Sequence, residues 1–314
     1  MVSISSSNVL NRPLVERVAA GLLTSPGLVE KDWHVTRALA VLARFDHGAA
    51  APAFGGGTSL SKGWGLIKRF SEDIDFKVAM PAATSRSKAR NERSYYRERI
   101  LAALTEAEFT LDGEPMKRDE SQFFSVNLFY PSLFVTGPGL RPHLRVEMTL
   151  TAPALPPVTR PIGSLIGMAE RKPPEVSAFP CVDPVETAAD KLSALAWRVH
   201  ARQRGSDQDD PTIIRHLHDL AALKETVATS SGFADLVRQT AAGDVGRGGE
   251  ATAAIAPATL LSGMLEKLTD DKLWAGEYQD YVDAVSFARP AERIGFDAAL
   301  AAVRDLVALI RESA

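Results

Sequence analysis

The chain has 314 residues, a single cysteine and nearly balanced charge, with 36 Lys and Arg against 39 Asp and Glu. That length usually exceeds what one hydrophobic core holds, which favours two sub-domains. The net charge of −3 excludes a global attraction to nucleic acid, so any contact with RNA must come from a local basic patch. One cysteine also excludes an internal disulfide and a metal site built from cysteine pairs.

The N-terminal stretch MVSISSSNVLNRPLVERVAAGLLTSP has polar and charged residues where a signal peptide needs an apolar run. Nowhere in the sequence do about 18 apolar residues follow one another, as a membrane-spanning helix requires. These patterns predict a soluble, cytoplasmic protein without a membrane partner.

In chain order, the first clear pattern is a helix over residues 25–45, because Leu28, Val35, Leu39 and Leu42 form one apolar stripe. Residues 53–80 then indicate a strand or tight turn, a short helix, and a second strand that ends in the alternating IDFKVAM. Further strands are expected at FFSVNLFY, residues 123–130, and HLRVEMTL, residues 143–150.

The proline-rich stretch Thr151–Pro161 breaks both helix and strand patterns and is the candidate domain boundary. The helical segment 183–204 follows, with Asp183 as N-cap, Pro184 at the first helical position and Glu186 in a capping-box arrangement. We therefore expect N-terminal helices and a core domain in residues 1–160, and a mainly helical C-terminal domain in residues 161–314.

The most informative stretch is FGGGTSLSKGWGLIKRFSEDIDFKV, residues 54–78. Glycines let the backbone approach a ligand closely, and acids one residue apart on a strand point to the same side. A phosphate-binding P-loop does not fit, because Ser61 precedes Lys62 and Gly63 follows it. A glycine turn, a short helix, a strand with D-x-D and a third acid on a later strand instead resemble the layout of the nucleotidyltransferase superfamily.

In that superfamily the glycine turn holds a nucleoside triphosphate and the acids hold a divalent metal. The resemblance implies triphosphate binding by Gly56, Gly57 and Thr58 and metal binding by Asp73, Asp75 and Glu147. Ser59, Lys62 and Arg69 complete the expected nucleotide-binding set. The cofactor would be Mg²⁺ or Mn²⁺, since carboxylates and phosphate oxygens suit such ions and two of them can stabilise both the attacking and the leaving oxygen.

Each of these residues also has an ordinary structural interpretation. Gly55–Gly57 could form a simple turn, and SEDID could be an acidic strand start. Glu147 could lie on a solvated strand face. The solvent-exposed face of the short helix could be formed by Lys62, Lys68 and Arg69.

Four segments together resemble the AbiEii/AbiGii toxin family of bacterial nucleotidyltransferases, whose members include the mycobacterial MenT toxins. They are EKDWHVTRAL at 30–39, GGTSLSKGWGLIKRFSEDIDF at 56–76, DPVETAADKLSAL at 183–195 and RHLHDL at 215–220. The family pattern contains an essential lysine in E-x-x-x-x-K-x-x-A-L and an essential aspartate in R-D-x-x-D-L. Lys191 and Asp219 occupy those positions, whereas His216 stands where the family usually has its first aspartate.

This resemblance implies an α+β nucleotidyltransferase-type core, a mixed sheet with flanking helices, followed by a helical C-terminal domain. The implied reaction is transfer of NMP from an NTP to the 3′ acceptor end of tRNA, with catalysis by Asp73, Asp75, Lys191, Asp219 and Glu147. The result would be blocked translation, controlled by an antitoxin encoded nearby. Two alternatives are nucleotidyl or phosphoryl transfer to a protein or small molecule, and a non-catalytic nucleotide-binding regulator.

Three further features bear on contacts with partners. Residues 86–99 are locally basic, and the candidates for binding an RNA backbone are Arg86, Arg90, Arg93 and Arg97. Ser71 lies two residues before Asp73 and either caps a turn or serves as a regulatory phosphosite, where a phosphate would repel the NTP. A third feature, the stripe Lys191, Arg198 and Arg202 on one helix, is either a solvated face or a surface for phosphate groups.

Overall fold

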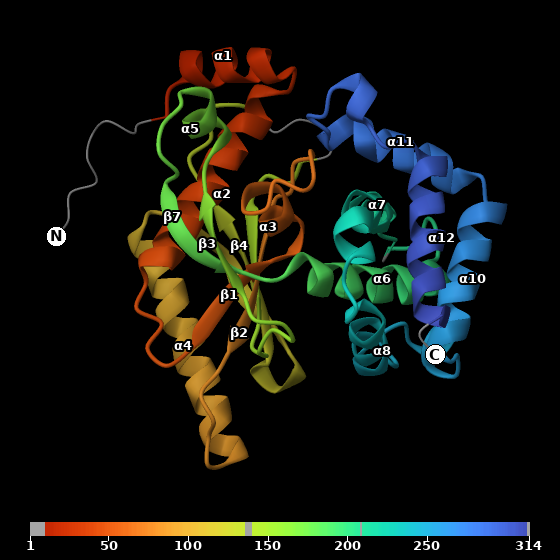
Figure 1. The fold of residues 1–314 in the computed structure, drawn as a ribbon. Helices are drawn as coiled ribbons and strands as arrows, with labels where there is room; N and C mark the ends of the chain where they lie inside the picture. The colour runs from red at the N-terminus through yellow and green to blue at the C-terminus, as the bar shows by residue number, and fades with distance from the viewer. Residues whose placement is uncertain (1–9, 136–139, 208, 313–314) are drawn as a thin grey trace. The chain divides into compact units, whose positions relative to one another are not determined.

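A computed structural model describes residues 10–135, 140–207 and 209–312, so the first residues of the stretch tested for a signal peptide lie outside it. The chain forms two compact units, drawn in Figure 1. The first unit consists of Met1–Trp64, Phe70–Pro153 and Pro157–Cys181, and the second of Gly65–Arg69, Ala154–Pro156 and Val182–Ala314. In the part of the chain that is described, no helix is long and apolar enough to cross a membrane.

The first unit is built on one mixed sheet of seven strands in the order β3-β4-β5-β2-β1-β7-β6. Its strands are β1 Ala51–Gly55, β2 Asp73–Ala79, β3 Thr110–Arg118, β4 Phe123–Phe129, β5 Leu144–Thr149, β6 Val158–Ile162 and β7 Val176–Cys181. Its helices are α1 Arg12–Leu22, α2 Pro26–Arg44, α3 Gly56–Lys62, α4 Arg86–Glu106 and α5 Leu165–Ala169, with a 3₁₀ turn at Asp119–Ser121.

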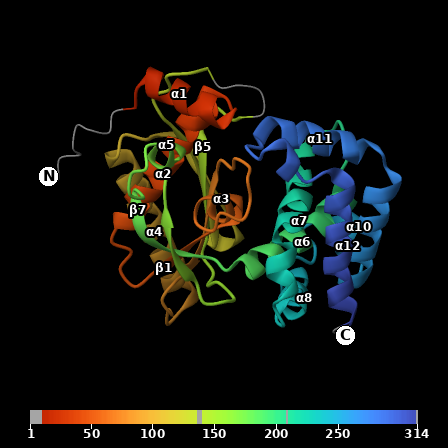
Figure 2. The same ribbon diagram turned by 45° about the horizontal axis from the view of Figure 1, so that its top comes forward.

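One face of the central strands is apolar and forms the core. Residues alternate along β2, so Ile74, Phe76 and Val78 are buried while Asp73 and Asp75 point to the other side. The long helices α2 and α4 pack apolar residues into the same core and are seen together behind the strands in Figure 2. The opposite face is therefore the one that carries the acids.

The turn from β1 into α3 requires glycine. Gly56 has a φ of +68°, and a Cβ built on it would lie 1.9 Å from Oδ2 of Asp75. Both the left-handed backbone and the missing side chain are thus needed, and they bring the backbone of the turn against a carboxylate of β2.

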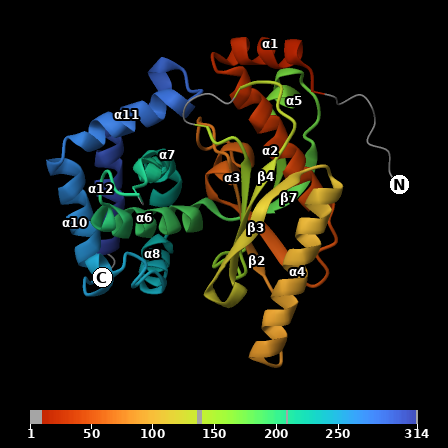
Figure 3. The same cartoon turned by 180° about the vertical axis from the view of Figure 1, so that it is seen from behind.

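The second unit is helical among its described residues. Its α-helices are α6 Pro184–Ala201, α7 Arg215–Ala228, α8 Phe233–Gly243, α9 Glu250–Ala253, α10 Pro257–Asp270, α11 Leu273–Val285 and α12 Phe296–Glu312, with 3₁₀ turns at Pro211–Ile214 and Pro290–Glu292. Figure 3 shows α6 running beside α7, and these two helices carry the predicted Lys191 and Asp219.

The mixed sheet with flanking helices and the helical C-terminal region confirm the predicted α+β fold class. The predicted helix and strands at α2, β2, β4 and β5 are present, and Asp183 caps α6 by accepting from the backbone N–H of Val185 at 2.8 Å. The expectation that prolines break the strand pattern over Thr151–Pro161 is wrong at its end, where β6 begins. Pro161 lies in this edge strand, where a missing N–H is tolerated.

Candidate functional site

The three predicted metal ligands lie on two neighbouring parallel strands. The register of β2 and β5 places Asp75 directly opposite Glu147 and Asp73 opposite Arg145. Because residues opposite each other in a ladder share a face, all three acids lie on the side of the sheet away from the core. Gly55 at the end of β1 is paired with Asp75 on its other edge, so the glycine turn and the acids form one continuous surface.

Two arginines form ion pairs with two of these acids. Nη1 of Arg141 lies 2.6 Å from Oδ1 of Asp73, and Nε of Arg145 lies 2.6 Å from Oε1 of Glu147. Among the described residues, no group of three or more acids, histidines or cysteines is gathered in a geometry ready for a metal. The donor set of carboxylates nevertheless fits Mg²⁺ or Mn²⁺ chemically, and the missing Cβ of Gly56 lets the backbone of the turn lie directly against the carboxylate of Asp75.

A buried lysine that no sequence pattern singled out supports this surface. Lys31, in α2, is completely buried and donates to the carboxylate of Glu72 and, at 2.5 Å, to the backbone carbonyl of Arg141. Glu72 also accepts from the backbone N–H of Arg141 at 3.1 Å. Burial lowers the pKa of Lys31, and the charge of Glu72 opposes that shift. The signal was present in EKDWHVTRAL, where three consecutive charged residues lie in a helix that also carries an apolar stripe.

The ammonium group of Lys62 is buried and does not face solvent. Its ammonium group lies 2.6 Å from Oδ1 of Asp32 and donates to the hydroxyl of Thr36 at 2.9 Å and the carbonyl of Gly163 at 3.1 Å. These partners use all three of its hydrogens, and its side chain is only 6% exposed. In this arrangement Lys62 secures α3 to α2, so the structure does not bring it to the acids.

The two hydroxyl residues of the glycine turn also face inward. Thr58 donates its hydroxyl to the carbonyl of Asp73 and so fastens α3 to the start of β2. Ser59 is buried next to the Cys181 thiol, whose pKa is raised by burial. Within the turn, Gly56 is half-buried, whereas Gly55 and Gly57 are buried, so Gly56 is the glycine that solvent reaches.

A second cluster lies in the helical unit and joins three predicted residues. Asp219, in α7, is fully buried, and its carboxylate accepts two hydrogen bonds of 2.6 Å from the guanidinium of Arg69. The ammonium of Lys191, in α6, lies 2.8 Å from the same carboxylate. Burial alone would raise the pKa of Asp219, but the charges of Arg69 and Lys191 hold it well below its usual range. Arg69 therefore joins Lys191 and Asp219 instead of the glycine turn.

His216 is buried close to this cluster. Neither of its ring nitrogens has a hydrogen-bond partner within the described parts of the chain. Burial and the positive charges of Lys191 and Arg215 lower its pKa well below the ordinary value, so the imidazole is neutral. At the position where the family pattern has an acid, this chain thus carries an uncharged side chain.

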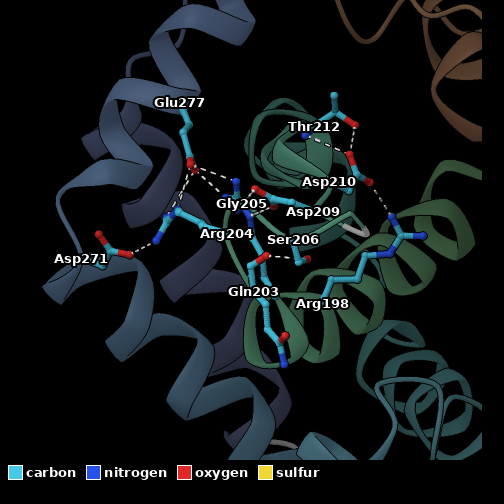
Figure 4. Close-up of polar contacts among 11 residues, drawn as sticks. Arg198, Gln203, Arg204, Gly205, Ser206, Asp209, Asp210, Thr212, Asp271 and Glu277 are labelled. Carbon is cyan, nitrogen blue, oxygen red and sulfur yellow. Dashed lines mark hydrogen bonds and ion pairs between the residues drawn. The ribbon is translucent and has the colours of Figure 1, made fainter.

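The predicted basic stripe on α6 is largely neutralised by acids. Figure 4 shows Arg198 in contact with Asp210, at 3.3 Å, and the neighbouring loop bound through Arg204 to Glu277. Arg202 is nearly buried and pairs with Glu277 at 2.6 Å as well as with a second acid. The stripe is therefore mostly an internal network and not an open surface for phosphate.

The basic segment 86–99 forms the first part of α4. Arg86 and Arg90 are exposed, and Arg86 pairs with Glu120 at 2.9 Å, whereas Arg93 is half-buried. Arg97 is only 6% exposed. The predicted RNA-binding residues therefore divide into an exposed N-terminal pair and a C-terminal pair turned toward the protein.

The glycine turn, the D-x-D strand and the third acid on a parallel neighbour define the class of a nucleotidyltransferase core. A family model described as nucleotidyl transferase AbiEii toxin, type IV toxin–antitoxin system, matches residues 37–302. The chain therefore belongs to the AbiEii nucleotidyltransferase toxin family. This confirms the predicted family and implies an NTP substrate and a cognate antitoxin.

Among solved structures, the chain is similar to MenT4, a nucleotidyltransferase toxin from Mycobacterium tuberculosis H37Rv. The TM-score is 0.61 at 20% sequence identity, over 97% of this chain and 90% of that one, which shows a shared fold. No curated protein matches the sequence.

Removing different charges of the buried cluster should lower the stability of the protein by unequal amounts. Asp219→Asn leaves Lys191 and Arg69 buried without their shared carboxylate, which we expect to cost about 3–5 kcal/mol of unfolding free energy. Lys191→Met removes one of two cations and keeps the bidentate Arg69 pair, so we expect less than half of that loss. Urea unfolding of both variants checks the order, and an equal or larger loss for Lys191→Met would contradict it.

Proposed function

We propose that this toxin transfers NMP from an NTP to a 3′ hydroxyl of RNA, the acceptor end of tRNA, and releases pyrophosphate. The single observation that carries the proposal is the surface formed by the Gly56 turn, Asp73, Asp75 and Glu147 on one side of the sheet. Blocked tRNA acceptor ends would stop translation, which accounts for toxicity.

In this proposal the backbone of the glycine turn admits the triphosphate and the three acids hold Mg²⁺ or Mn²⁺. When bound, the metal would neutralise phosphate charge and favour departure of pyrophosphate. The chain's own contribution is position: the register of β2 and β5 fixes Asp75 beside Glu147, and Thr58 fixes the turn to β2. Oriented groups of this kind lower a barrier without having to reorganise during the reaction.

Lys191 and Asp219 enter the proposal as catalytic residues on the strength of the family pattern. The structure supports a preorganised ammonium group, because Asp219 binds it and Arg69 fixes Asp219. If Lys191 acts in catalysis, the Lys191→Met variant loses turnover while it remains folded. Full activity of the folded variant would leave the residue a structural role only.

The acids give the direct test of function. Asp73→Asn and Asp75→Asn should each lower nucleotide transfer roughly 100-fold or more, because each removes a charged oxygen from the site. The assay is incubation of the purified protein with labelled NTPs and total cellular RNA, followed by separation of RNA, protein and free nucleotide. Asp46→Asn, an exposed acid in the turn before β1, is the matched control and should transfer like the wild type.

The labelled product distinguishes the acceptor classes. Labelled tRNA supports the proposal, and labelled protein or small molecule supports transfer to another acceptor. Nucleotide that is bound but never transferred supports a non-catalytic regulator. Wild-type transfer by Asp73→Asn or Asp75→Asn would overturn the assignment of the acids.

We further propose that the exposed start of α4 binds the RNA backbone. Arg86, Lys88 and Arg90 are exposed there, and Figure 3 shows this end of α4 extending beyond the strands of its unit. Arg93 and Arg97 contribute less in this proposal, because they are partly or fully buried in the described structure.

Reversing the three exposed charges together should weaken RNA binding. The slope of log affinity against log salt concentration should become shallower by roughly 0.9 for each phosphate contact that is lost. NTP affinity should stay unchanged. The same reversal at Lys117, Arg118 and Arg171, which are also exposed, serves as control. Equal RNA affinity of wild type and the α4 variant across a salt series would show that the patch is merely solvated.

Ser71 is proposed as the site at which the antitoxin controls the enzyme. It is half-buried and lies two residues before Asp73, so a phosphate there would add about −1.5 to −2 charges beside the acids and repel the NTP. Ser71→Ala should keep catalysis and escape neutralisation by the antitoxin. Growth of cells that co-express both proteins, with mass spectrometry of neutralised wild type, tests this; rescue of the Ser71→Ala strain or an unmodified Ser71 would refute it.

A further inference from the structure

Arg141 is a charged residue next to the acids that neither the sequence pattern nor the proposed reaction uses. It precedes β5 and places its guanidinium 2.6 Å from Asp73, with Nε 3.5 Å from Glu72. This arginine therefore places a positive charge directly against the first acid of the D-x-D pair.

The backbone and the side chain of Arg141 are held very differently. Its carbonyl accepts from the buried Lys31, and its N–H donates to Glu72, so the backbone is fixed at both polar groups. The side chain, in contrast, is 34% exposed. A fixed backbone with a partly solvated guanidinium allows the side chain to change partner without movement of the strand.

A divalent cation and the guanidinium of Arg141 would compete for the carboxylate of Asp73. Both are positive and both seek the same carboxylate, so each weakens the binding of the other through charge repulsion. A triphosphate relieves the conflict, because its oxygens offer the planar, two-point partner for which arginine is suited.

We propose that Arg141 is the residue that couples metal binding to nucleotide binding. Without nucleotide it occupies Asp73 and keeps the affinity for a divalent cation low. With NTP present it transfers from Asp73 to a phosphate group of the nucleotide and leaves the acid to the metal. The inference rests on the proposed nucleotide site and adds a residue that discourages metal binding until substrate is bound.

The proposal predicts effects of opposite sign from one substitution. Arg141→Gln removes the competing charge, so Mn²⁺ should bind the nucleotide-free protein about 3- to 10-fold more tightly. The same change removes a phosphate partner, so a non-hydrolysable NTP analogue should bind about 10-fold more weakly. The proposal also predicts that Mn²⁺ and nucleotide enhance each other's affinity in the wild type, and this enhancement should be smaller in Arg141→Gln, since coupling between two ligands is reciprocal.

Mn²⁺ binding is measured by electron paramagnetic resonance of the free ion and nucleotide binding by equilibrium titration, so neither readout needs turnover. Arg118→Gln, an exposed arginine on β3, is the matched control and should behave as the wild type in both. Arg141→Lys keeps the positive charge but loses the planar guanidinium group that can bind two phosphate oxygens at once. Its Mn²⁺ affinity should therefore be closer to that of the wild type than its nucleotide affinity is. If urea titration shows that Arg141→Gln is strongly destabilised, the binding of both ligands is compared between Arg141→Lys and the wild type instead.

The outcomes separate this inference from the proposed function. Unchanged Mn²⁺ and nucleotide affinities in both folded Arg141 variants, with normal binding by the wild type, would overturn the role of Arg141 alone. Loss of both affinities together would make Arg141 an ordinary supporting residue and would also overturn it. Wild-type protein that binds neither ligand would refute the nucleotide site itself, and the inference with it.

Discussion

The site depends on one row of residues that crosses four strands. Backbone pairing places Gly55 of β1, Asp75 of β2, Glu147 of β5 and Ser125 of β4 side by side. A slip of one residue in any of these pairings would move the acids to the apolar face. The buried residues that alternate with them, such as Ile74 and Val146, make such a slip costly, so the hydrophobic core determines where the carboxylates lie.

Charge compensation is the second organising feature. Asp73 and Glu147 each lie against an arginine, Glu72 against the buried Lys31, and Asp219 against Arg69 and Lys191. A buried carboxylate without a partner is expensive, and here each of these acids has a cation within the same unit. The pattern also separates two kinds of cation, those fully buried with their acid and those, like Arg141, that remain in contact with solvent.

Local patterns in the sequence predicted a large part of the fold and the acids. The stripe of α2, the alternation in β2 and β5 and the cap of α6 are each determined by residues a few positions apart, so periodicity and capping rules suffice. Strands β3, β6 and β7 escaped prediction because glycine or proline interrupts them and neighbouring strands, not their own alternation, stabilise them. The contacts of Glu72 with Lys31 and Arg141 escaped prediction for a related reason. These partners lie 41 and 69 residues from Glu72 in the sequence, and no local spacing reveals such contacts. The inward orientation of Lys62 and Ser59 is likewise a matter of tertiary packing.

The way the chain is divided between its units limits how the protein can be taken apart. Arg69, which balances Asp219, comes from the short segment Gly65–Arg69, and Glu186 of α6 accepts from the backbone N–H groups of Ala154 and Leu155, in another short segment. A fragment that starts at Val182 would keep all the helices from α6 onward yet lack both segments. Its buried aspartate would lose its bidentate partner and its first helix would lose two backbone contacts. The helical half is consequently no detachable module, and recombination between relatives would have to exchange three separate stretches of sequence to transplant it intact.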